Sequence, residues 1–283
     1  MKTRHCFLWI LLAGMLSFTA CRDKDLDMTV WNKTLYQDAV INEISAEDAW
    51  DVMVICDDSS YVELKYSAFL EEYLKVQLNG TALQIGFSRY LNLPGNTEMT
   101  AIVHTPAVHK LSFSDAVTAV VDGQFPETAL TLELSDASHC RGGHFYGSAN
   151  IKMSDAAQCV EFSFEGTTCT VNLDDASILR CSLNVSGDLT LNIDDASRMT
   201  DYWGEMNHVV AEVSDASYLN MATSWINRMN IEVTDASEAT VNVVESLEGK
   251  VHAASRLYYS GDPVLNVDCD GTSTLQQVDY PNP

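Results

Sequence analysis

The sequence predicts an all-β, single-domain parallel β-helix with coils of about 20 residues, capped by an irregular N-terminal β region. Two observations carry this prediction. An Asp-Ala motif recurs at a nearly constant spacing, and apolar and polar residues alternate on both sides of each copy. The constant spacing indicates a stacked repeat, and the alternation indicates strands.

Each copy of the repeat centres on an aspartate followed by an alanine. Successive copies lie 21, 19, 20, 20, 20 and 20 residues apart, and two degenerate copies, centred on Ala253 and Gly271, follow at intervals of 18. Such a period is typical of a solenoid, in which each coil contacts its neighbours. The repeated aspartates are Asp115, Asp136, Asp155, Asp175, Asp195, Asp215 and Asp235.

The residues that flank these corners alternate with the period of a strand. An apolar residue stands two positions before every corner, from Phe113 to Cys269, and a polar residue precedes it. A second apolar column stands four positions after the corner, from Ala119 to Leu275. A period of two indicates half-buried strands, because a helix would repeat every 3.6 residues. Each corner is therefore predicted to turn the chain from one sheet into the next.

Residues 39–106 indicate strands of less regular length. Asn79-Gly80 lies between two β-like runs and is a hairpin turn signal. We expect residues 39–106 to cap the solenoid, so that its apolar interior does not face water, and residues 107–283 to form the repeat coils. Both parts are expected to form one domain, 39–283; a separate small β domain is the alternative.

The N-terminus has the layout of a secretory signal peptide over residues 1–20. Lys2 and Arg4 precede an apolar run that is too short to span a bilayer. The sequence that ends at Cys21 resembles a bacterial lipobox, which implies that Cys21 carries the lipid. Residues 21–38 begin with a polar, acidic stretch and are predicted to be a flexible tether. An ordinary signal peptide and a secreted soluble product are the alternative.

The charge balance excludes one class of partner. Residues 1–20 hold two of the 16 basic residues and none of the 40 acidic ones, which leaves a net charge of −26. Such a surface repels nucleic acid and anionic membranes, so we expect no nucleic-acid partner and membrane attachment through the lipid alone. The acidic stretch after Cys21 resembles the export signals of Bacteroidetes lipoproteins. We expect an exported outer-membrane lipoprotein, at the cell surface or on the periplasmic face.

Three features of the sequence resemble the adhesin-head or GIN domain proteins of Bacteroidetes, a domain of unknown function with a β-helical fold. They are the repeated corners, the entry segment that begins at Trp50, and the ending Leu257-Tyr258-Tyr259-Ser260-Gly261-Asp262-Pro263, which is similar to the family's Tyr-x-Gly-x-Pro. The resemblance covers residues 40 to 280 and implies the β-helix. It transfers no catalytic residue, and this chain has Asp where the family usually has Gly.

The corner aspartates allow two interpretations. Stacked roughly 5 Å apart and joined by Asp174 and Asp194, they could hold Ca²⁺ through carboxylate oxygens. Alternatively, each aspartate adopts a left-handed conformation and caps local backbone N–H groups. The family's glycine and Gly271 favour the second interpretation. We therefore expect a structural ladder and neither a metal site nor a cofactor, with Ca²⁺ the one cation that the ladder could contact.

Other candidate side chains have competing interpretations. Cys140 and Cys159 share the column four past the corner, so they are expected to face each other, as a disulfide or, preferably, as buried free thiols. His139 and His144 flank Arg141-Gly142-Gly143 without an accompanying nucleophile, which favours a loop over an acid–base site. Six aromatic residues after the corners could stack on sugars or a partner, although burial is favoured. They are Phe145, Tyr146, Tyr202, Trp203, Tyr218 and Trp225.

These features lead to two function classes. The favoured one is a non-catalytic binding or adhesion module of the cell envelope, in which an acidic rod presents a repeated face to an unidentified glycan or protein, as a monomer or a homo-oligomer. The alternative is an envelope enzyme acting on polysaccharide, a lyase-like β-helix, which rests on analogy of fold alone. It would need a groove with converging Asp, Arg or Lys side chains.

Overall fold

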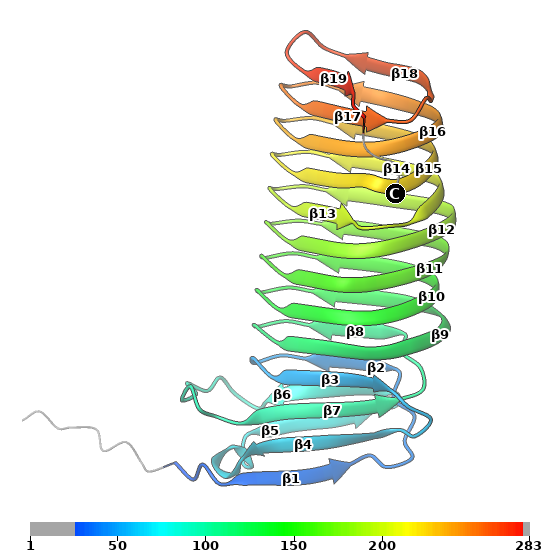
Figure 1. Cartoon of the computed structure of the whole chain (residues 1–283). Coiled ribbons are helices and arrows are strands. Elements are labelled where there is room, and N and C mark those ends of the chain that lie inside the picture. Colours follow the sequence, from blue (N-terminus) through cyan, green and yellow to red (C-terminus); the bar gives the residue numbers. More distant parts are fainter. Residues whose placement is uncertain (1–25, 280–283) are drawn as a thin grey trace, which may run out of the picture.

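Alternating side chains bury one face of each strand, and the coils stack those faces into a rod (Figure 1). The computed structural model describes residues 26–279; the predicted signal peptide, Cys21 and the first residues of the tether lie outside them. The strands are β1 (Val30–Leu35), β2 (Glu43–Ala46), β3 (Asp51–Cys56), β4 (Tyr61–Ser67), β5 (Leu74–Asn79), β6 (Ala82–Phe87), β7 (Met99–Thr105), β8 (Lys110–Phe113), β9 (Thr118–Leu134), β10 (His139–Met153), β11 (Gln158–Leu173), β12 (Ile178–Ile193), β13 (Arg198–Asp201), β14 (Glu205–Val213), β15 (Tyr218–Val233), β16 (Glu238–Val251), β17 (Arg256–Ser260), β18 (Val264–Cys269) and β19 (Thr274–Gln277). A short 3-10 helix covers Ala68–Leu70.

The strand register confirms the predicted parallel β-helix. Each coil pairs in parallel with the coils before and after it, so that equivalent residues stand in columns. The column four past the corner joins Ala119, Cys140, Cys159, Leu179, Met199, Leu219, Ala239, Leu257 and Leu275, as the repeat predicts.

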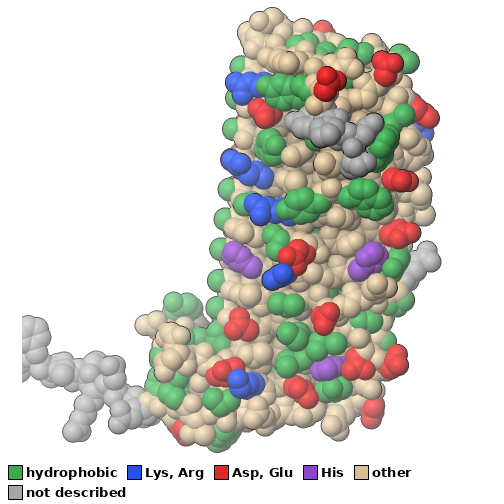
Figure 2. All heavy atoms as spheres, viewed as in Figure 1, with side chains coloured by type: hydrophobic (Ala, Val, Ile, Leu, Met, Phe, Trp, Pro, Cys, Tyr) green, Lys and Arg blue, Asp and Glu red, His purple; other side chains and the backbone are tan. Residues whose placement is uncertain are grey.

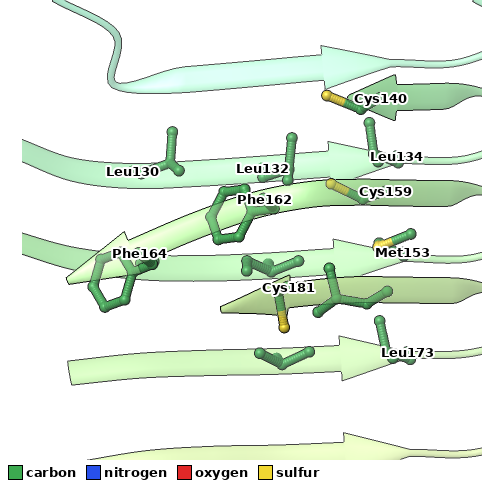
Figure 3. Close-up of a cluster of buried hydrophobic side chains, with 14 of the residues drawn as sticks. Leu130, Leu132, Leu134, Cys140, Met153, Cys159, Phe162, Phe164, Leu173 and Cys181 are labelled. Carbon is green, nitrogen blue, oxygen red and sulfur yellow. The ribbon is translucent and has the colours of Figure 1, made fainter. Parts of the chain in front are cut away.

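The core lies between the two strand segments that flank each corner. Figure 3 shows Leu132 and Leu134 facing Cys159 and Phe162 from the opposite side of the coil. These four side chains are at most 2% exposed. Full burial of a large apolar side chain contributes about 1.5 to 3 kcal/mol, and no coil can bury its apolar face without neighbours.

The corners are four-residue turns with two consecutive left-handed residues. At Asp195 and Ala196 the φ angles are 47° and 61°, and the Ser197 N–H donates to the Asp194 carbonyl over 3.1 Å. Positive φ at both central positions defines a type I′ turn. The Ala196 N–H also donates to the carbonyl of Asp215, one coil further on, over 2.8 Å. Each turn is therefore fixed both by its own hydrogen bond and by the next coil.

The same left-handed pair occurs at every predicted Asp-Ala corner and at Ala253-Ala254. Gly271 departs from this pattern, because its φ is not positive and the Asp270 side chain accepts hydrogen bonds from the Thr272 N–H and hydroxyl instead. The last degenerate copy is thus a different turn, and it does not support the left-handed interpretation of the others.

One corner lies inside the region that the sequence predicts to be an irregular cap. Asp48 and Ala49 have φ angles of 66° and 57°, and the Ala49 N–H donates to the Asp115 carbonyl over 2.8 Å. β2 pairs with β8 and β3 pairs with β9, both in parallel, so β2 and β3 form a coil. This copy lies 67 residues before Asp115, because β4 to β7 are inserted between the two corners. It therefore does not follow the constant spacing of the other copies.

The inserted strands and β1 lie at the N-terminal end of the rod (Figure 1). β4 pairs antiparallel with β1 and β7, while β5 and β6 form a hairpin at Asn79-Gly80, where Gly80 has a φ of 66°. Trp50 is fully buried against Phe87 at this end. β1 lies within residues 21–38, which were predicted to be a flexible tether, so the part of that range from Val30 to Leu35 is instead a paired strand of the cap. The domain boundary at residue 107 stays a prediction. No helix within residues 26–279 has the length and apolar character needed to cross a membrane.

Candidate binding groove

A groove of about 810 Å³ follows the rod along the second bend of the coils, away from the Asp-Ala corners in sequence. The strand register shifts at this bend, between Gly147 and Ser148 in β10 and between Gly166 and Thr168 in β11. A Cβ atom on Gly166 would lie 2.1 Å from the Gly147 carbonyl oxygen, so only glycine allows the two coils to approach this closely. The bend therefore combines close backbone packing with an open surface.

A column of outward side chains from successive coils forms one wall of the groove. Tyr146 pairs with Glu165, Glu165 with Asn184, and Glu205 with Trp225. Asn184 and Glu205 are linked as well, because the Glu205 N–H donates to the Asn184 side-chain oxygen over 2.9 Å. Aromatic rings stand at the two ends of this column, and carboxylate and amide groups lie between them.

A short loop adds further aromatic rings. The loop Tyr202–Gly204 interrupts the ladder between β13 and β14 and brings Trp203 to the groove. Tyr202, Trp203 and Trp225 are 52%, 49% and 37% exposed. The Trp225 N–H donates to the Gly204 carbonyl over 2.8 Å, which ties the loop to the next coil. Burial, the interpretation favoured from the sequence, is wrong for these three residues.

The prediction of burial is confirmed for Phe145. Its ring lies between the rings of Phe125 and Phe162, at centroid distances of 5.1 and 5.5 Å. Tyr146 and Tyr218 are half-buried. Strand parity explains the difference, because Phe145 points into the core and its neighbour Tyr146 points out to the groove.

Asp201 supports the loop from inside the rod, and the sequence analysis missed it. Its side chain is buried, although its column neighbour Cys181 is apolar. The carboxylate accepts the Leu183 N–H over 3.0 Å and the Ser224 hydroxyl in a short contact. Burial raises the pKa of Asp201 to about 7. Its signal in the sequence is an acidic residue at an inward position, which no repeated column of residues points out.

The corner aspartates are exposed and lie apart from the groove residues in the coil sequence. Asp136 and Asp155 accept the hydroxyls of Ser135 and Ser154 over 2.7 and 2.8 Å. The corner aspartates were expected to cap backbone N–H groups. At two corners the preceding residue forms the cap instead, because Asp174 and Asp194 accept the N–H groups of Asp175 and Asp195, both over 2.9 Å.

Two sets of carboxylates come together at these corners. The structure places Asp174, Asp175 and Asp195 in one set and Asp194, Asp195 and Asp215 in the other, with oxygens within 4.8 Å of one another. The charge of Asp194 raises the pKa of Asp195, whereas the Ser214 hydroxyl lowers the pKa of Asp194. Repulsion among these exposed groups is therefore only partly relieved, and Ca²⁺ binding stays a prediction.

The two cysteines and two histidines that the sequence singles out have different surroundings in the structure. Cys140 and Cys159 are paired in register as predicted and carry free, buried thiols. The hydrogen bond with Cys140, together with burial, raises the pKa of Cys159 well above its usual range. His139 is exposed beside a corner, whereas the His144 ring packs against the Tyr146 ring in a tilted arrangement, with the two centroids 4.5 Å apart.

Arg141, the remaining candidate in that cluster, is engaged elsewhere. Its guanidinium donates to both carboxylate oxygens of Glu161, over 2.6 and 2.9 Å. A bidentate pair of this kind orients the guanidinium toward Glu161. The groove itself is lined by carboxylates and amides, without an arginine or lysine among its lining residues.

Acidic and hydrophobic side chains are spread along the visible face of the rod, and basic ones are fewer (Figure 2). Because the whole chain carries a net charge of −24, this distribution favours neutral or basic ligands over anionic ones.

Comparison with known proteins places this geometry in a family. Residues 41–263 match the family described as "Putative auto-transporter adhesin, head GIN domain". The fold is similar to a "putative adhesin" from Parabacteroides distasonis (TM-score 0.69, 16% identity, 89% of this chain and 98% of that chain covered). It is also similar to a "putative adhesin" from Parabacteroides merdae (TM-score 0.59, 13% identity, 89% and 97% covered) and to a "putative lipid binding protein" from Parabacteroides distasonis (TM-score 0.50, 12% identity, 90% and 98% covered).

At these identities the solved structures establish the fold, and no curated protein sequence matches the chain. The family match covers most of the sequence and includes both the corners and the groove. The chain belongs to the adhesin-head GIN domain family.

Proposed function

We propose that the protein is a non-catalytic binding module of the cell envelope, exported, anchored by a lipid on Cys21, and active through its groove. The observation that carries this proposal is the exposure of Trp203 and Trp225 in the groove, with the exposed Tyr202 next to them in the loop. Large exposed aromatic groups gathered in a concave surface mark ligand sites in soluble proteins. The names of the related structures support an adhesin-like role.

The course of the chain supports display away from the membrane. The described part begins at Leu26, next to β1, at the capped end of the rod (Figure 1). A lipid on Cys21 would therefore hold the cap near the membrane. The groove is lined by residues of β10 to β16, several coils further along the rod, where a ligand outside the cell could reach it.

The arrangement of polar groups favours binding over catalysis. Glu165 and Glu205 both face the groove, two coils apart, which corresponds to roughly 10 Å between their backbones. Both side chains are exposed, and neither carboxylate forms a hydrogen bond within the described residues. This arrangement supports a binding module over the polysaccharide enzyme of the alternative hypothesis.

Two experiments test the proposal. The full chain, purified in mild detergent, is applied to an array of neutral and acidic glycans and of immobilised extracellular proteins, and release of reducing ends or unsaturated sugars is followed in parallel. Retention on at least one surface without product release is expected. Product that accumulates with time and disappears in Glu165→Gln or Glu205→Gln would refute the non-catalytic proposal.

The anchor is tested separately by Cys21→Ala. Stable membrane retention depends on acyl chains, so the variant should move from the membrane fraction to the soluble fraction. A Cys56→Ala variant controls for the loss of a cysteine elsewhere in the chain. Unchanged fractionation of Cys21→Ala would contradict the lipid anchor without bearing on the groove.

A further inference from the structure

We propose that the groove binds an extended, uncharged oligosaccharide laid along the rod axis between Tyr146 and Trp225. This inference rests on the proposed function and names the ligand class of its site. It follows from the shape of the site, the chemistry of its side chains, and the ligands that its charge and backbone exclude.

The site is long and straight. Tyr146, Glu165, Asn184, Glu205 and Trp225 come from five successive coils and stand in one outward column. At the spacing of parallel strands, the column extends about 19 Å from its first to its last residue. A site that repeats its contacts along a straight line suits a linear polymer better than a compact molecule.

The side chains of the groove suit the chemistry of a sugar ring. A pyranose ring presents a face of C–H groups and an edge of hydroxyls, so it needs aromatic faces together with polar groups that both donate and accept. Trp203 and Trp225 supply exposed aromatic faces at one end of the groove, and Tyr146 supplies a ring at the other. The carboxylates and amides of the column lie between them.

The polar groups of the groove are available to a ligand. The oxygen of Asn184 accepts the Glu205 N–H, which fixes the amide and leaves its NH₂ group free to donate. Asn207 and Asn227 line the groove beside the column, and their side chains form no hydrogen bond within the described residues. The Ser186 hydroxyl is held by the Gly166 carbonyl over 3.2 Å and can still accept.

The charge and the backbone of the groove exclude other ligand classes. Glu165 and Glu205 repel anionic glycans and phosphate groups, and none of the described lining residues is basic. An extended peptide would gain most of its affinity by pairing with a free strand edge. The groove offers no such edge, because β10 to β15 are paired on both sides by neighbouring coils. The aromatic and amide side chains of the groove then favour a neutral sugar chain.

The test is calorimetric titration of the full chain in mild detergent with neutral cello-, xylo- and chito-oligosaccharides, from disaccharide to hexasaccharide, and with oligogalacturonate as the acidic comparison. At least one neutral series should bind, with affinity that rises with chain length and levels off once the chain spans the groove. Trp225→Ala and Trp203→Ala should each weaken binding about tenfold, equivalent to about 1.4 kcal/mol.

Trp31→Ala is the matched control. Trp31 is 46% exposed, close to the 49% of Trp203, but it lies on β1 outside the groove, so its loss should leave binding unchanged. Thermal melts of all variants check that the fold is retained. Glu205→Gln should weaken neutral binding only slightly and, because it removes a repulsive charge, should increase any binding of oligogalacturonate.

The outcomes separate this inference from the proposed function. Absence of binding to every neutral series, or equal loss in Trp31→Ala and Trp225→Ala, overturns the inference. If the chain is nevertheless retained on a protein or an acidic glycan of the array, the binding module stands with a different ligand or site. Binding of oligogalacturonate in preference to the neutral chains would likewise overturn the inference.

Discussion

The two bends of each coil contrast with each other in sequence and in chemistry. The Asp-Ala bend repeats almost without change from Asp115 to Asp235, whereas the groove bend carries Glu165, Asn184 and Glu205 at equivalent positions in successive coils. At the first bend the backbone requires two left-handed residues per coil, which few residue types adopt. At the second bend most positions face outward without such a requirement, so their side chains are free to serve a ligand.

A residue type that repeats strictly from coil to coil indicates a position at which the backbone conformation limits the choice of residue. Ala196 shows this clearly, because its N–H bonds the next coil while its side chain is exposed and contributes little. A departure from repetition has a different meaning. The loop that carries Trp203 breaks a ladder and requires Asp201 to satisfy the Leu183 N–H, at the cost of burying a carboxylate.

The largest expected effect concerns this buried carboxylate. The folded pKa of Asp201 is about 7, above the ordinary 3.8, so the folded state keeps a proton that the unfolded state loses. The free energy of unfolding should therefore be highest near pH 4 and fall by about 4 kcal/mol as the pH rises to 8, apart from the contributions of other groups. Asp201→Asn should remove this fall and be the more stable protein at pH 8. Urea unfolding of both proteins at pH 4.5, 6 and 8 measures the difference, and parallel pH profiles would contradict it.

The second effect tests whether the groove bend also has a backbone requirement. Gly166→Ala places a Cβ 2.1 Å from a carbonyl oxygen that belongs to the neighbouring coil, so the coils must separate, with an expected loss of about 3 kcal/mol. Gly95→Ala is the matched control, because nothing lies within 4 Å of its added Cβ. Chemical denaturation compares the two variants with the wild type. Equal stability of both variants would show that the close approach at the groove bend is not needed.

The third effect is smaller and separates a backbone role of the corner aspartates from ion binding. Asp195→Gly keeps the left-handed φ of 47° without strain and should change stability by less than about 1 kcal/mol. Asp195→Val should lose about 1 to 2 kcal/mol, because a β-branched residue is strained there. Thermal melts with Ca²⁺ and with EDTA distinguish the roles. A loss that depends on Ca²⁺ and is equal in both variants would support a calcium ladder instead.

Much of the fold could be predicted from the sequence because the repeat is a direct consequence of the corner geometry. The columns through Cys159 and Leu173 follow from period and parity alone. The copy at Asp48 could not be found by period, since the inserted strands shift it, although its Asp-Ala pair was a local signal. At Gly271 the prediction failed because Asp270 and Thr272 form a different turn.

The groove was less predictable because it depends on side chains that do not repeat. Parity predicts that Tyr146 and Phe145 face opposite sides, but it cannot tell which side becomes concave. The loop at Trp203 was visible only as an irregularity in one coil. Its support by Asp201 is a contact between strands, which requires the register of three successive coils.

The central claim is that the groove bend binds and the Asp-Ala bend holds the fold. Amide hydrogen exchange of the full chain, with and without a saturating neutral hexasaccharide, tests it most directly. The account predicts slower exchange on ligand addition in residues 202–206 and 223–227, with no change in residues 194–197 at the corner. Protection at the corner instead of the groove, or a hexasaccharide that binds without protecting either groove segment, would contradict it.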